Sequence, residues 1–314
     1  MQIILDFRSR TVSRLDLLDK MIILDLLQNC RQSYQAIAKK NGVTLNAIKK
    51  RVQGYLDDGI IEFSLEPHLA NFDGDWAMAL VTTGGTEDPE IFMNQLGQHN
   101  MINEVGALSG GGYIVFATYA GRENLSELAR FLRTADHVKG VELHQVAIEK
   151  GKKVQFSRGE LKILRCLFNY PRMRLSRLAE CTGYSAKTVR RGLQRIMEGN
   201  GIWFTLRLRL NAGDSISFLA RIEWDERKGD MQEILNWLKH EFPVSYWVPL
   251  ISISQPVMFC SFVVDRVKGI NPIMERIKSA DFVKSALPIM GSKSYSFPDI
   301  RRQWLEKKFL ELES

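Results

Sequence analysis

Residues 36–50 read AIAKKNGVTLNAIKK, and residues 177–191 read RLAECTGYSAKTVRR, the same pattern 141 positions later. Each copy has an alanine (Ala38, Ala179), a glycine four residues on, and a β-branched residue six positions after the glycine. A helix-turn-helix needs these residues, because the alanine lets two helices cross closely and the glycine takes the strained turn. The β-branched residue anchors the second helix to the core. A repeat at a fixed period changes the interpretation of the whole fold, so an internal duplication is expected.

The apolar spacing around each copy predicts three helices followed by a short wing strand. The helices span 15–28, 34–40 and 45–57 in the first copy, and 160–170, 175–181 and 186–197 in the second. Asp58-Gly59 and Asn200-Gly201 end the third helices, and wing strands follow from Ile60 and over 202–210. Both sets are typical of a winged helix-turn-helix.

Behind each three-helix set the pattern changes to strand, helix, strand, strand, helix, strand, the order of a ferredoxin-like half-barrel. We therefore expect an α+β chain in which two winged helix-turn-helix domains alternate with two ferredoxin-like (RAM-like) βαββαβ domains. The expected boundaries are 1–67 and 154–211 for the winged domains, 73–150 and 214–292 for the βαββαβ domains, and 298–314 for an amphipathic C-terminal helix.

Composition narrows the class of protein. The chain has 314 residues, 45% of them hydrophobic and 25% charged, as in soluble globular proteins. No apolar run approaches the ~20 residues of a membrane span, and the N-terminus lacks the layout of a signal peptide; a cytoplasmic protein without a membrane partner is expected. Four scattered cysteines predict reduced, buried thiols rather than a disulfide or a zinc site. The five histidines show no metal-ligand spacing, no catalytic Ser/His/Asp set is evident, and no cofactor is expected.

Positive charge is concentrated in the second copy. Residues 151–211 hold fourteen Lys/Arg against three acids, a net charge of +11, whereas residues 20–66 hold seven against five, a net charge of +2. The whole chain carries +7. Such clustering suits a polyphosphate partner, and double-stranded DNA is the one expected.

The combination resembles the Lrp/AsnC family of bacterial and archaeal transcription regulators, and its tandem form looks most like archaeal members. The matching residues of the first winged unit are Leu18-Asp19-Lys20, Ile23-Leu24, Ile37-Ala38, Gly42-Val43-Thr44, Ile48-Lys49-Lys50-Arg51-Val52 and Gly59-Ile60-Ile61. Val105 to Gly110 followed by Tyr113-Ile114-Val115 looks like the strand-glycine-strand element of the family's effector module. The resemblance implies a regulator that binds DNA, and a small-molecule effector near Ser109, Gly110, Gly111 and Gly112. The alternative for these four residues is a permissive hairpin turn. The second module departs from the pattern, because its turn, residues 253–256, has no glycine.

The third helices carry the candidate DNA-reading residues. Ile48, Val52 and Leu56, like Val189, Leu193 and Met197, are expected to anchor them to the core. The opposite faces are expected to contact base edges and phosphates in a major groove, and the alternative is a solvated helix face. The predicted DNA-binding residues are Thr44, Asn46, Lys49, Lys50, Gln53, Ser185, Lys187, Thr188, Arg190, Arg191, Gln194 and Arg195, with Arg207 and Arg209 on the second wing.

Two other functions are alternatives. Siroheme decarboxylases share this domain order, but their arginine-rich wing entry and His-Cys-Tyr stretch are not matched by residues 61–64 and 108–113. A scaffold that does not bind DNA is disfavoured by the cationic third helices.

The duplication also leads to two expectations about the tertiary structure. The two βαββαβ sheets should pair within the chain through Ala79, Val81 and Phe116 against Phe218, Phe259 and Phe262. The Trp304/Phe309 helix should contact a second copy in a homodimer.

Overall fold

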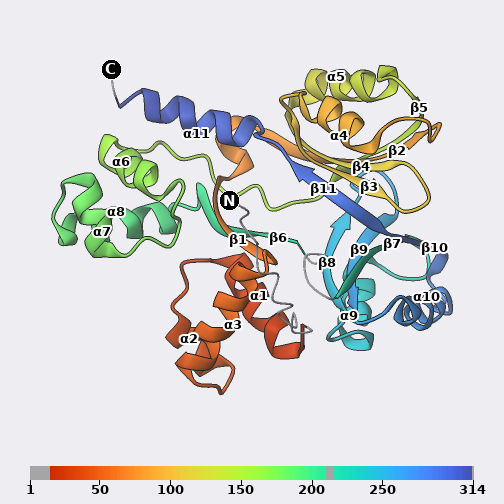
Figure 1. The fold of residues 1–314 in the computed structure, drawn as a ribbon, viewed down its shortest axis with the longest axis horizontal. Coiled ribbons are helices and arrows are strands. Elements are labelled where there is room, and N and C mark those ends of the chain that lie inside the picture. Colours follow the sequence, from red (N-terminus) through yellow and green to blue (C-terminus); the bar gives the residue numbers. More distant parts are fainter. Residues whose placement is uncertain (1–14, 210–214, 313–314) are drawn as a thin grey trace, which may run out of the picture.

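The computed structural model describes residues 15–209 and 215–312, and Figure 1 shows their arrangement. The first three-helix unit comprises α1 (Leu17–Gln28), α2 (Tyr34–Lys40) and α3 (Leu45–Asp57). Each helix begins at a polar cap: the side chains of Asp16, Ser33 and Thr44 accept the N–H groups of Asp19, Ala36 and Ala47. The second three-helix unit comprises α6 (Arg158–Leu167), α7 (Leu175–Thr182) and α8 (Ala186–Glu198).

A two-stranded ribbon joins the three-helix units. Strand β1 (Ile61–Pro67) follows the first unit, strand β6 (Ile202–Leu208) follows the second, and the two pair with each other in antiparallel register. Ser64 lies opposite Thr205, which is its own counterpart in the repeat. This pair therefore marks a local twofold axis that relates the first unit to the second.

Two larger sheets lie beside this ribbon and the three-helix units. The first has the order β11-β3-β4-β2-β5, from β2 (Gly74–Thr83), β3 (Ile102–Leu108), β4 (Tyr113–Ala120), β5 (Val138–Val146) and β11 (Gly291–Ser296). The second has the order β10-β7-β9-β8, from β7 (Ile216–Trp224), β8 (Tyr246–Ile251), β9 (Val257–Val264) and β10 (Val283–Ile289). Helices α4 (Pro89–Gly97) and α5 (Gly121–Thr134) cover the first sheet, and α9 (Met231–Glu241) and α10 (Ile270–Lys278) cover the second.

The sheets pack against each other within the chain, as predicted, but mostly through other residues. Met78, Ile114 and Val146 of the first sheet meet Val257 and Phe259 of the second, with Phe116 beside them. The predicted contacts Ala79 and Val81 instead face α4 and α5, and Phe218 and Phe262 face α9 and α10. Neighbouring residues of a strand point to opposite faces, and both faces of these strands are apolar. The alternation therefore gave no sign of which face meets the other sheet.

The position of the C-terminal helix shows that the predicted contact of this helix with a second copy is wrong. Helix α11 (Ile300–Leu310) lies beside the second three-helix unit (Figure 1), where Leu305 and Phe309 are buried with Leu161, Leu164 and other residues of α6. Trp304 packs at the edge of the same cluster. The apolar stripe expected to contact a second copy is thus covered by the chain itself. Strand β11, just before this helix, was not predicted from its polar sequence GSKSYS.

The core anchors of the third helices are shifted by one position at their C-terminal ends. Ile48, Val52, Val189 and Leu193 are buried as predicted, but Tyr55 and Ile196 complete the two stripes. Leu56 is only partly buried, and Met197 is 40% exposed. At 100° per residue, a residue seven positions after the first anchor lies closer to the buried face than one eight positions after it.

Within the described residues, no helix is long and apolar enough to cross a membrane.

Asp19, in the Leu18-Asp19-Lys20 stretch, has a buried carboxylate that connects two helices. The Asp19 side chain is 2% exposed and accepts hydrogen bonds from the Tyr55 hydroxyl and the Arg51 guanidinium, which ties α1 to α3. Asp19 also completes a capping box with Asp16. Burial, followed by the hydrogen bond to Asp19, raises the pKa of Tyr55. The carboxylate is therefore a structural element of the first three-helix unit.

Replacing Asp19 by asparagine will lower the free energy of unfolding by about 1–2 kcal/mol. The amide removes the charge facing Arg51, and its single oxygen cannot accept from both the Tyr55 hydroxyl and the Asp16 N–H. Urea titration measures the loss. Asp16→Asn is the matched control: Asp16 is 53% exposed, and asparagine caps helices as well as aspartate does. Equal stability losses in the two variants would contradict the role given to the buried Asp19.

Candidate nucleic-acid interface

The exposed faces of α3 and α8 carry the predicted DNA-reading residues at equivalent positions. Within the described part of the chain, five of these cations have no carboxylate partner: Lys49, Lys50, Lys187, Arg190 and Arg191. Asn46 is exposed beside them. The free cations of two equivalent helix faces are thus available to an external anion.

Other predicted residues on these helices have local partners. Gln53 donates to Asp57 at 2.8 Å, and its counterpart Gln194 donates to Glu198 at 2.7 Å. Thr44 and Ser185 cap α3 and α8, and the Ser185 hydroxyl also contacts that of Thr188 at 2.9 Å. These side chains are exposed but already engaged within their own helices.

Arg195 is paired with a second helix. Its Nε lies 2.8 Å from Oε1 of Glu160, whose other oxygen completes a capping box with Ser157 at the start of α6. Burial raises the pKa of Glu160, but the Arg195 and Ser157 hydrogen bonds outweigh it and hold that pKa below its usual value. Arg195 therefore helps to fasten α8 to α6, and contact with a ligand would compete with this pair.

The wing arginines lie along the β1–β6 ribbon. Arg207 is 3.4 Å from a Glu66 oxygen, and Arg209 is 3.7 Å from a Glu62 oxygen, so both have carboxylates of the other strand as neighbours. Because β6 pairs with β1, the second wing is part of the joint between the three-helix units. The predicted DNA contact of these two arginines stays a prediction.

The turn Ser109–Gly112 has a structural explanation. Gly110, Gly111 and Gly112 have φ values of 92°, 96° and 90°, which side-chain-bearing residues rarely adopt. A Cβ on Gly112 would stand 2.7 Å from the carbonyl oxygen of Val81. Ser109 N–H donates to Met290 O at 2.7 Å, which connects the turn to the chain between β10 and β11. The glycines are needed for this hairpin whether or not an effector binds there.

A pair of arginines that sequence analysis did not single out holds the two units together. Arg31 donates to the carbonyls of Pro171 and Met173, and Arg172 donates to those of Cys30 and Gln32. Each donor and each acceptor has its counterpart 141 residues away in the other copy. Arg31 also lies over the Phe204 ring and Arg172 over that of the equivalent Phe63. We call this pair the arginine clasp; arginine at both equivalent positions was its only sequence signal.

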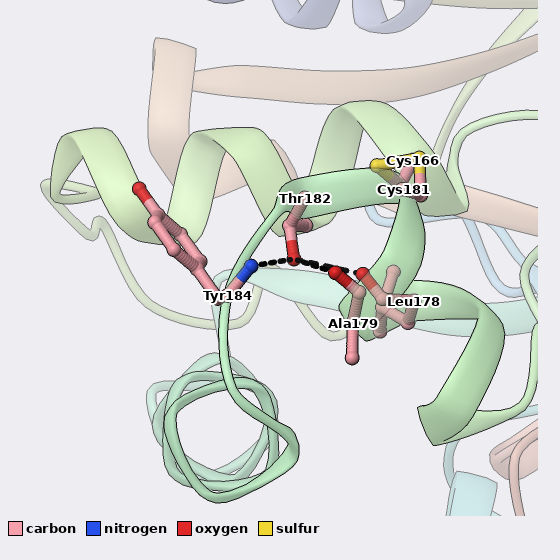
Figure 2. The surroundings of a disulfide bond; sticks show 6 residues. All are labelled: Cys166, Leu178, Ala179, Cys181, Thr182 and Tyr184. Carbon is pink, nitrogen blue, oxygen red and sulfur yellow. Dashed lines mark hydrogen bonds between the residues drawn. A yellow bond between two sulfur atoms is a disulfide. The ribbon is translucent and has the colours of Figure 1, made fainter.

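The cysteines correct the prediction of four reduced thiols. Cys166 of α6 and Cys181 of α7 form a disulfide across 15 residues (Figure 2), whereas Cys30 and Cys260 are free and buried. The bond lies beside the turn of the second helix-turn-helix, where the Thr182 hydroxyl donates to Leu178 O at 2.8 Å. Helix packing brings the two sulfurs together, and sequence spacing alone does not reveal it. Burial raises the pKa of Cys30 to about 12, so its thiol is a poor partner for exchange.

Replacing Cys166 and Cys181 together by alanine will lower the free energy of unfolding by about 3 kcal/mol, because closing a loop of this length restricts the unfolded chain by that amount. Denaturant titration with and without a reducing agent measures the loss. The reductant should bring the wild-type protein to the stability of the double variant and leave the variant unchanged. A wild-type protein that is insensitive to reductant would contradict the bond's stabilising role.

No family model matches the chain. A curated relative, an uncharacterized HTH-type transcriptional regulator of Pyrococcus furiosus, is 33% identical over 69 residues, which are 21% of this chain and 46% of that protein. The chain therefore matches less than half of that relative's length.

Among solved structures, the siroheme decarboxylase NirDL superposes on 95% of this chain and 100% of its own, with a TM-score of 0.58 and 11% identity. Escherichia coli AsnC covers 46% of this chain and 99% of its own, with a TM-score of 0.32 and 19% identity. The first similarity shows a shared fold over nearly the whole chain, and at 11% identity it shows the fold alone.

Proposed function

We propose that this chain is a DNA-binding transcription regulator of Lrp/AsnC type that reads duplex DNA through α3 and α8. In this proposal residues 1–67 and 154–211 are the reading domains, and residues 73–150 and 214–292 form the paired βαββαβ domains. The local similarity to a helix-turn-helix regulator supports it. So do the five free cations on equivalent faces of the two third helices.

The observation that carries the proposal is the local twofold axis through Ser64 and Thr205. It relates α3 to α8 within a single chain, as a dimer axis relates two recognition helices in other helix-turn-helix proteins. Two recognition helices related by a twofold axis suit two DNA half-sites in inverted orientation. Because the second unit carries more charge and arginine in place of lysine, the two half-sites are expected to differ in sequence.

Selection from a random duplex library tests the proposal. We expect an imperfect inverted repeat to be enriched, and its affinity to fall steeply as salt rises, because phosphate contacts release counterions. Equal affinity for random and enriched duplexes, or affinity independent of salt, would contradict the proposal.

The predicted effector at Ser109–Gly112 and the predicted homodimer are separate proposals. If light scattering finds a 36.0 kDa species at micromolar concentration, the homodimer is rejected. Helix α11 is not available as its contact, because its apolar residues pack inside the chain.

The full-length fold similarity to NirDL makes a siroheme decarboxylase-like enzyme the second candidate. The wing entry Ile61-Glu62-Phe63-Ser64 and the stretch 108–113 lack the residues that the enzymes' pattern would place there. Titration of the purified protein with an iron tetrapyrrole distinguishes the two. A stoichiometric shift of the absorption band would favour the enzyme, and failure to bind would leave the regulator.

A further inference from the structure

A cleft of about 880 Å³ opens between the two three-helix units, beside the arginine clasp. Apolar and aromatic side chains that include Phe63 and Tyr170 form part of its wall. Its charged residues are four arginines and one glutamate: Arg172, Arg174, Arg177, Arg209 and Glu62. The cleft therefore combines an apolar body with an excess of positive charge.

The local twofold axis gives this cleft a counterpart, in which a tryptophan and a histidine replace two of the charged residues. Trp203 stands where Glu62 stands in the other copy, and its indole N–H donates to Gln28 O at 3.3 Å. The Trp203 ring stacks on His68, the counterpart of Arg209, with 6.2 Å between ring centroids. The backbones match closely: His68 N–H donates to Gly201 O, and Arg209 N–H donates to the equivalent Ile60 O. The difference between the clefts thus comes from side chains on a shared backbone frame.

The other substitutions between the copies also make the open cleft cationic. Ser33 and Ala36 of the first copy correspond to Arg174 and Arg177 of the second. Ser33 caps α2, whereas Arg174, at the same position before α7, makes no side-chain cap. Arg174 has no carboxylate partner among residues 15–209 and 215–312.

The remaining charges of the cleft leave room for an anion. Arg177 pairs with Glu180 on the surface, and Arg209 lies 3.7 Å from Glu62; exposed pairs of this kind contribute little energy. Arg172 is held by the clasp carbonyls, which cannot neutralise its charge. Among the residues that line the cleft, one glutamate stands against four arginines, and within the described chain only Arg177 and Arg209 of these have a carboxylate neighbour. Carboxylates and phosphates are the anions that arginine binds with paired hydrogen bonds.

We propose that this cleft binds a small organic carboxylate with an apolar or aromatic body. The arginines hold the carboxylate, and the wall that includes Phe63 and Tyr170 holds the body. The apolar wall distinguishes such a ligand from a phosphate of the DNA backbone, which offers nothing to fill it. The site does not depend on DNA binding, so it stands or fails separately from the regulator proposal.

Titration with 1-naphthoate and its uncharged analogue 1-naphthalenemethanol tests the site by calorimetry. The acid should bind about tenfold more tightly than the alcohol or better, and Arg174→Gln should weaken the acid about tenfold. Two variants of the exposed Glu62 should act in opposite directions. Glu62→Trp introduces the bulky side chain that the other copy has at this position and should abolish binding, while Glu62→Gln removes the competing carboxylate and should tighten it several-fold.

Circular dichroism and thermal melting confirm that each variant folds. Equal binding of the acid by the wild-type protein and Glu62→Trp, or equal binding of acid and alcohol, would overturn the site. If Arg174→Gln weakens duplex DNA but leaves 1-naphthoate unaffected, the arginines belong to a DNA-contacting surface, and the carboxylate site is likewise rejected.

Discussion

Replacing Arg190 and Arg191 together by alanine will weaken binding to a selected duplex by about 2–6 kcal/mol, because each lost base contact costs about 1–3 kcal/mol. Replacing Lys49 and Lys50 will cost less. Both pairs are exposed at equivalent positions, but arginine binds guanine through two hydrogen bonds and lysine acts as a point charge. Each lost phosphate contact also flattens the dependence of log affinity on log salt by about one unit. Fluorescence anisotropy at several salt concentrations measures both quantities.

Arg130→Ala with Arg133→Ala is the matched control, because it removes the same charge from the exposed face of α5, which covers the first sheet. It should change affinity only slightly. Equal losses for the arginine and lysine pairs would show that both units read DNA alike. A larger loss for the lysine pair would mean that the basic second unit serves another acidic partner.

Removing the arginine clasp by Arg31→Ala with Arg172→Ala will lower the free energy of unfolding by about 4–6 kcal/mol. The double variant loses charge-assisted hydrogen bonds to four carbonyls, which stay partly buried. It also loses the stacking of Arg172 on Tyr34, in which the guanidinium lies 4.1 Å from the ring centre. Denaturant titration followed by circular dichroism measures the loss. Burial lowers the pKa of Arg31, as expected for a cation that is held by carbonyls rather than by water.

The single variants provide the internal control. Arg31→Ala and Arg172→Ala act on one interface, so their losses should not simply add. Arg190→Ala removes an exposed arginine and should change stability by no more than about 0.5 kcal/mol. A loss below about 1 kcal/mol for the double clasp variant would mean that the β1–β6 ribbon alone joins the two units.

The helices of the two three-helix units could be predicted because their signals are local. The caps Ser33 and Thr44 lie within a few residues of the helices they start, and Gly42 has the positive φ of 65° that the turn requires. Helices α2 and α3 accordingly begin and end at the predicted residues 34–40 and 45–57. The exposed faces with Lys49, Lys50, Arg190 and Arg191 follow from the same periodicity.

The sheet interface could not be predicted in the same way. Ala79 and Met78 are neighbours on β2, both are buried, and only the placement of the second sheet makes Met78 the interface residue. The polar strand β11 pairs with β3, about 190 residues earlier in the chain, and no local pattern marks such a pairing.

The sequence by itself determined the repeated pattern 141 residues apart, the helices of the two three-helix units and the excess of positive charge on the second, because these depend on short-range periodicity and composition. The tertiary structure alone decided four features: the β1–β6 ribbon, the arginine clasp, the Cys166–Cys181 disulfide and the open cleft beside Glu62. Each of them depends on contacts between separate elements of the fold, and no local sequence pattern marks which elements meet. The physical reason is that burial and hydrogen bonding select partners by position in space, and the same arginine or cysteine would suit many other positions.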